Sequence, residues 1–90
     1  MAFEGMDVDE VRSLAGQLQT QAQKITEVVS SIDSIVSSME NVWKGKDATD
    51  FLSWWQTQHK PHLNQAEEAI MGLHQSALNN ASAQDQASGQ

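Results

Sequence analysis

The chain has no cysteine, no tyrosine, one proline and only five lysine or arginine residues among ninety. Without cysteine, neither a disulfide framework nor a thiolate metal site can stabilise so small a domain. The twelve acidic residues give a net charge of −7, which argues against binding to nucleic acid or to anionic lipids. No apolar run approaches the roughly 20 residues of a membrane-spanning helix. Composition alone favours a small, acidic, soluble intracellular protein of one domain.

Two long segments with helical periodicity make up most of the chain. The first helix is expected over about 8–42, after a short N-terminal arm (1–6), with Asp7 as N-cap and Glu10 completing a capping box. Its apolar residues recur in alternating steps of three and four, as in a coiled coil. They are Val8, Val11, Ala15, Leu18, Ala22, Ile25, Val29, Ile32, Val36, Met39 and Trp43. A second row, Leu14, Val28, Ile35 and Val42 with Gln21 as its polar member, widens the apolar face beyond what one neighbouring helix needs.

Trp43-Lys44-Gly45 lies near the middle of the chain and predicts a turn over 43–46. We expect Gly45 to adopt a positive φ that ends the first helix, and the Trp43 indole to fill the space where the two helices diverge.

The second helix is expected over about 47–78, with Asp47 as N-cap. Its apolar row comprises Ala48, Leu52 or Phe51, Trp55, His59, Leu63, Ala66, Ile70, Leu73 and Ala77. Pro61 either bends this helix or opens a third one, and the unbroken phase of the row favours a kink near 61. Residues 79–90 contain no large apolar side chain, so a flexible C-terminal tail without core contacts is expected.

Together these features predict an all-α protein, a helix-turn-helix hairpin of two long antiparallel helices. A two-helix layer leaves an apolar face uncovered, so pairing into a four-helix bundle dimer is expected. The residues expected on the core and dimer face are Leu14, Leu18, Ile25, Val28, Ile32, Ile35, Met39, Trp55, Leu63, Ile70 and Leu73.

No set of residues indicates catalysis, and no cofactor is expected. His59 and His62 are three residues apart, but two imidazoles without a third ligand make a weak metal site. A structural role explains the two histidines better, because both flank Pro61, where backbone carbonyls freed by the kink need hydrogen-bond donors. His74 is isolated from them in the sequence. Trp54 and Trp55 are adjacent and about 100° apart around a helix. Because Trp55 follows the apolar row, Trp54 points away from it and is the residue most indicative of a partner contact.

The central Trp43-Lys44-Gly45 turn between two long helices, in a chain of this length, resembles the WXG100 (ESAT-6-like) family of type VII secretion substrates. The resemblance covers roughly residues 7–85 and implies a hairpin that forms a homodimer or a heterodimer with a related protein. It also implies folding in the cytoplasm and secretion, by a membrane-embedded ATPase that reads the C-terminal tail, without a cleaved signal peptide. The start Met1-Ala2-Phe3-Glu4-Gly5 indeed has neither a basic nor an apolar signal region.

The chain departs from the family's Tyr-x-x-x-Asp/Glu export pattern. Asp85 can occupy the acidic position, but Ala81 stands where the tyrosine belongs, which makes this a degenerate export signal. Either the partner in a heterodimer carries the signal, or the system reads other residues of the tail. A non-secreted coiled-coil adaptor or chaperone-like module, with a coincidental Trp-x-Gly, is the alternative function.

Overall fold

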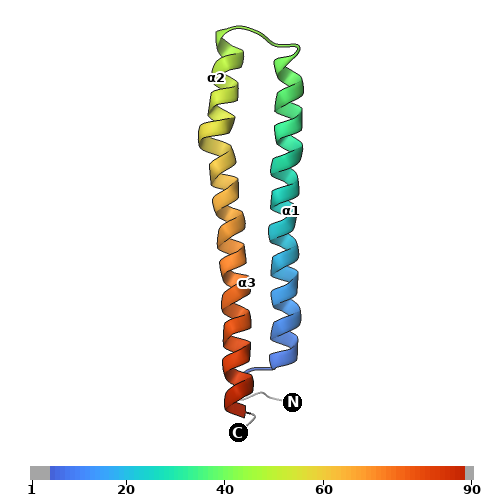
Figure 1. The fold of residues 1–90 in the computed structure, drawn as a ribbon, viewed down its shortest axis with the longest axis vertical. Helices are drawn as coiled ribbons and strands as arrows, with labels where there is room; N and C mark the ends of the chain where they lie inside the picture. The colour runs from blue at the N-terminus through green and yellow to red at the C-terminus, as the bar shows by residue number, and fades with distance from the viewer. Residues whose placement is uncertain (1–4, 89–90) are drawn as a thin grey trace.

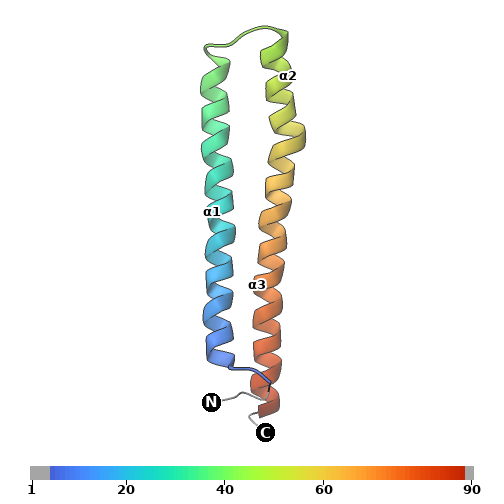
Figure 2. The same cartoon turned by 180° about the vertical axis from the view of Figure 1, so that it is seen from behind.

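The computed structural model describes residues 5–88 as a helical hairpin (Figure 1). The elements are α1 (Val8–Glu40), α2 (Lys46–Trp54), the π-helical turn η1 (Trp55–His59) and α3 (Lys60–Ser88). One arm is α1, and α2, η1 and α3 run on as the second arm, antiparallel to it along its whole length (Figure 2). The predicted all-α hairpin is therefore confirmed, whereas its pairing into a four-helix bundle stays a prediction.

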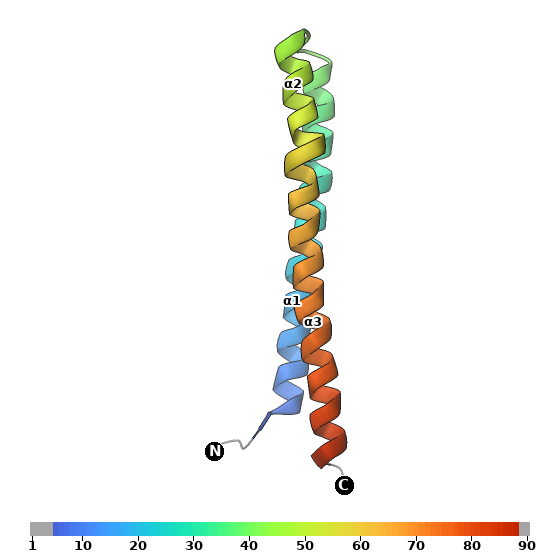
Figure 3. The same ribbon diagram turned by 90° about the vertical axis from the view of Figure 1, so that its left-hand side faces the viewer.

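The hairpin is a single layer of two helices. It measures 67 × 19 × 16 Å, and seen edge-on the two arms lie one in front of the other (Figure 3). Each arm therefore buries one stripe of side chains against the other, and both broad sides of the layer face outward. Tertiary contact is confined to the line where the arms meet.

The first helix begins where its capping residues predict. The Asp7 side chain accepts a hydrogen bond of 3.1 Å from the Glu10 backbone N–H, and Asp9 and Glu10 occupy the first turn, where negative charge is favoured by the helix dipole. The helix ends at Glu40, slightly before the expected boundary at 42, because the N–H groups of Asn41 and Val42 close a tighter final turn on the carbonyls of Ser38 and Met39, respectively.

Gly45 has the expected positive φ but a different position in the turn. Its φ of 110° and ψ of −175° place it immediately before α2, as the N-cap residue, whereas α1 has ended at Glu40. Asp47, expected to cap the second helix, lies instead in its first turn. The Gly45 carbonyl accepts bonds of 3.1 Å from both the N–H and the hydroxyl of Thr49. The helix can begin at Lys46 because glycine alone tolerates this backbone conformation.

The second arm passes Pro61 by widening one turn. The Lys60 N–H bonds to the Trp55 carbonyl, five residues back, because proline lacks an N–H and its ring clashes with the carbonyl four residues earlier. The expectation that the apolar row keeps its phase across the proline is therefore wrong. The extra residue puts His59 on the exposed side and brings Lys60 to the position facing α1.

The core is a narrow stripe of small and medium side chains. Its buried residues on α1 recur every seven positions and are Ala15, Ala22, Val29 and Val36. The second arm contributes Trp55, His74 and Ala81. Around Val29, Val36 and Trp55 pack Ile25, Ile32, Leu52 and Leu63, which are only partly buried.

The C-terminal segment differs from the flexible tail expected over 79–90. As far as it is described, it is helical up to Ser88, and Ala81 is completely buried. Large side chains are not required for this contact, because alanine lets the two helices approach closely. Residues 1–4 of the N-terminal arm and 89–90 of the tail lie outside the described part of the chain.

Gly45→Ala should destabilise the hairpin, because an added Cβ is strained at φ 110° although no atom lies within 4 Å of it. We expect a loss of about 1–3 kcal/mol in the free energy of unfolding, measured by urea titration with circular dichroism. Gly72→Ala is the matched control. It adds the same methyl group in α3, also without a neighbour within 4 Å, and should stabilise by up to about 1 kcal/mol. Equal effects of both substitutions would contradict the assignment of strain to Gly45.

Candidate interaction surface

A polar cluster joins the two arms at the level of η1. The Trp55 indole N–H donates to Asp33 Oδ1 at 2.8 Å, and the Lys60 ammonium lies 2.7 Å from Asp33 Oδ2. The hydrogen bond from Lys60 and then that from Trp55 hold the pKa of Asp33 below its ordinary value, and the Lys60 charge acts in the same direction. One carboxylate thus anchors residues on both ends of the widened turn.

A second polar contact joins the arms nearer the chain ends. His74 is only 8% exposed, and its Nδ1 lies 2.6 Å from the Ala15 carbonyl oxygen. Since a carbonyl only accepts, Nδ1 carries the proton. Sequence reasoning treated His74 as isolated. The shift of phase after η1 turns it inward, and only the identification of the π turn could have revealed this.

The two sides of the layer differ in polarity. On α1 one flank of the buried stripe is formed by the residues four positions after Ala15, Ala22 and Val29, which are Gln19, Thr26 and Asp33, all polar. The other flank is formed by the residues one position before each member of the stripe. These are Leu14, Val28 and Ile35, which are 47%, 50% and 59% exposed, together with Gln21. One side is therefore largely apolar and the other is not.

Grooves between the arms show that α3 contributes to the same apolar side. A groove of about 420 Å³ is lined by Val11, Leu14, Ala15, Gln17, Leu18, Gln21 and Ala77. A second, of about 230 Å³, is lined by Gln21, Lys24, Ile25, Val28, Leu63 and Ile70. Gln21 belongs to both grooves, so they lie end to end. We call this surface, made by Leu14, Leu18, Gln21, Ile25, Val28 and Ile35 with Leu63, Ala66, Ile70, Leu73 and Ala77, the apolar face.

The residues expected on the core and dimer face divide into three groups. Trp55 is buried within the hairpin. Leu14, Val28, Ile35 and Leu73 are exposed, the last at 59%. The remaining residues are half-buried, at the edge of the contact between the arms: Leu18, Ile25, Ile32, Met39, Leu63 and Ile70. These half-buried side chains are shared between the contact with the other arm and the outer surface.

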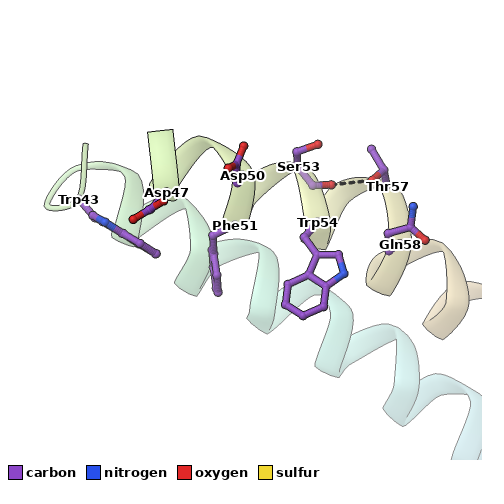
Figure 4. A pocket seen from close by; sticks show the side chains of 8 residues that line it. All are labelled: Trp43, Asp47, Asp50, Phe51, Ser53, Trp54, Thr57 and Gln58. Carbon is purple, nitrogen blue, oxygen red and sulfur yellow. Dashed lines mark hydrogen bonds between the residues drawn. The ribbon is translucent and has the colours of Figure 1, made fainter. Parts of the chain in front are cut away.

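Aromatic side chains gather at the turn. Trp43, itself 37% exposed, packs against Phe51 with ring centroids 5.3 Å apart. Phe51 and Trp54 project from the same side of α2 (Figure 4). With Asp47, Asp50, Ser53, Thr57 and Gln58 these rings line an open groove of about 560 Å³. Trp54 is 59% exposed and touches His59, whose ring centroid is 4.6 Å away. A wide, water-accessible aromatic surface of this kind is suited to contact with another macromolecule.

Ala81 and Asp85 occupy different environments on the same helix. Ala81 is buried against α1, whereas the Asp85 side chain is 61% exposed, with Arg12 3.4 Å away. An exposed ion pair of this length contributes about 1 kcal/mol or less, so Asp85 is accessible to a binding partner.

Within residues 5–88, no group of three or more histidine, aspartate or glutamate side chains is placed to hold a metal ion. None of the helices in this part of the chain combines the length and apolarity needed to cross a membrane.

The family model described as "Proteins of 100 residues with WXG" (WXG100) matches residues 5–87. The chain belongs to the WXG100 family. This family consists of small, helical, non-enzymatic proteins that are generally substrates of type VII secretion and generally pair with related members. No curated protein and no solved structure matches the chain.

Asp33→Asn should lower the melting temperature at pH 7, because the amide keeps an acceptor for Trp55 but loses the charge that faces Lys60. A lowered pKa means that the stabilisation by Asp33 is complete above about pH 4 and is lost as the pH falls further, through the pKa of the folded state. Melting curves from pH 7 to pH 2 should therefore converge for the two proteins at the acidic end.

Glu68→Gln, which neutralises an exposed carboxylate of α3, serves as the control and should leave the pH profile close to that of the wild type. An Asp33→Asn protein with the wild-type pH dependence would contradict the role given to Asp33.

Proposed function

We propose that this chain is a small secreted helical-hairpin protein, a substrate of a type VII secretion system that acts through pairing and through recognition by the export machinery. Membership of the WXG100 family supports secretion by a type VII system. The observation that carries the mechanism is the apolar face, which runs along one side of a single-layer hairpin and includes four side chains that are about half exposed or more.

The apolar face supports pairing with a second hairpin, either a copy of this chain or a related WXG100 protein. Contiguous apolar patches of this length are rare on proteins that work alone. A second two-helix layer placed on this side would complete a four-helix bundle and cover Leu14, Val28, Ile35 and Leu73. The polar side, with Asp33 and Lys60, would remain in water.

Recognition by the secretion ATPase is proposed to use the C-terminal end of α3. Asp85 presents its carboxylate to solvent there. The buried Ala81 offers no side chain to a receptor, so the aromatic contact typical of the family would come from a paired protein or from other residues near the tail. Export would take place on the folded protein and without cleavage of a signal peptide, which places the mature protein outside the cell or in the envelope.

Ile35→Asp tests the pairing. Ile35 is already 59% exposed, so the hairpin should fold, but a paired state would bury an unpartnered carboxylate at a cost of at least about 3 kcal/mol. That cost raises the dissociation constant about 100-fold or more, measured by sedimentation velocity. Ser34→Asp introduces the same charge at the neighbouring exposed position and should leave association unchanged. Equal association of the two variants would mean that the apolar face does not pair.

Export is tested by expressing the full chain in a bacterium with a type VII secretion system. We expect the intact chain, with its N-terminus uncleaved, in the culture supernatant or envelope fraction, and its retention in the cytoplasm when the secretion ATPase is inactivated. A cytoplasmic marker protein controls for lysis. Retention in both strains, with any related hairpin protein co-expressed, would support the adaptor role instead.

A further inference from the structure

The π turn decides which side of α3 faces α1. After η1 the residues turned toward α1 are Lys60, Glu67, His74 and Ala81, at intervals of seven, and all four are buried or half-buried. A regular helix would step four residues from the buried Trp55 and bring His59 to this line, followed by Leu63, Ala66, Ile70, Leu73 and Ala77. The more polar line therefore faces inward, whereas in the more apolar row Ala66 and Leu73 are exposed and Leu63, Ile70 and Ala77 stay half-buried beside the contact with α1.

Two specific contacts stabilise this arrangement. Lys60 pairs with Asp33 at 2.7 Å, and His74 donates to the Ala15 carbonyl at 2.6 Å. Both belong to the inward row that the π turn creates. Rotating α3 by one residue, about 100°, would separate them and would bury Leu73 against α1 in their place.

Pro61 supplies the reason for the extra residue. A proline at this position cannot bond to the carbonyl of Thr57 and collides with it in a regular helix. The five-residue bond from Lys60 to Trp55 relieves that conflict. Widened turns of this kind occur frequently at functional sites, and here the consequence is a rotation of all of α3.

We propose that the π turn at Pro61 holds α3 rotated so that, within the row Leu63, Ala66, Ile70, Leu73 and Ala77, the exposed Ala66 and Leu73 face a second copy of this chain instead of α1, while the half-buried Leu63, Ile70 and Ala77 lie at the edge of both contacts. This inference rests on the proposed pairing and names the device that produces its surface. The row contains no charged residue, and neither does the adjacent row Leu14, Gln21, Val28 and Ile35 of α1. Two copies, each with a net charge of −7, can therefore meet at this face without burying a carboxylate between these rows.

Pro61→Ala tests the rotation, because it removes the obstacle to a regular helix. We expect α3 to turn Ala66 and Leu73 toward α1, so that the His74 ring loses its bond to the Ala15 carbonyl. The protected Nδ1–H signal of His74 in ¹⁵N-resolved NMR should disappear. The dissociation constant of the dimer, measured by sedimentation velocity, should rise on the order of tenfold or more, since the interface loses the burial of at least one leucine.

Deleting Gln56 in the Pro61→Ala protein provides the matched control. Gln56 is an exposed residue of η1, and without it Trp55 and Lys60 are four positions apart, so a regular helix restores the present phase of α3. The His74 signal and the wild-type dissociation constant should both return. This rescue separates the rotation from any other effect of losing proline, because both proteins lack it.

A Pro61→Ala protein that keeps the His74 signal and the wild-type association would overturn the proposal, as would a double variant that recovers neither. A wild-type chain that stays monomeric at every concentration would overturn the second copy as occupant. The His74 signal, read on that monomer, would still decide the rotation, so failure of pairing and failure of the π-turn mechanism are distinguishable.

Discussion

Two helices share only one line of contact, and this limit governs the rest of the molecule. The stripe on α1 that is fully covered consists of Ala15, Ala22, Val29 and Val36, side chains too small to build a thick core. The alanines let the helices approach closely near the chain ends, and Trp55 fills the wider space near the turn. Every larger aliphatic side chain on α1 reaches past this line and stays partly in solvent.

The hairpin resolves the competition between its apolar rows with polar contacts. Asp33, Lys60 and His74 hold the second arm in one rotational position, although a more apolar row is available one residue away. Hydrogen bonds and ion pairs are directional, whereas apolar contacts accept many orientations, so a few polar groups can select one packing among several of similar burial. The outcome is a hairpin that leaves much of its apolar surface on one side.

The turn and the apolar face form one extended surface. Phe51 and Trp54 lie on the same side of the second arm as Ala66 and Leu73 of α3. The π turn adds one residue, so that Lys60 instead of His59 faces α1, and the residues after it are turned accordingly. The aromatic groove near Trp43 is thus continuous in helical phase with Leu63, Ile70 and Leu73. This continuity supports the view that a partner covers the hairpin along most of its length.

Periodicity and capping chemistry in the chain alone specify the two arms, the start of α1 after Asp7 and the turn near Trp43 to Gly45. The Trp-x-Gly motif at that turn is what indicates the family. These features are local, and each depends on residues within one or two helical turns of one another. The apolar row predicted for the second arm matches the inward side as far as Trp55, whereas beyond it the exposed Ala66 and Leu73 do not. A proline can be accommodated by a kink, a break or a widened turn, and the choice depends on contacts across the hairpin. The inward positions of Lys60 and His74, the burial of Ala81 and the outward position of Leu73 come from that choice. Only the packed structure decides them, because one inserted residue rotates every side chain that follows it.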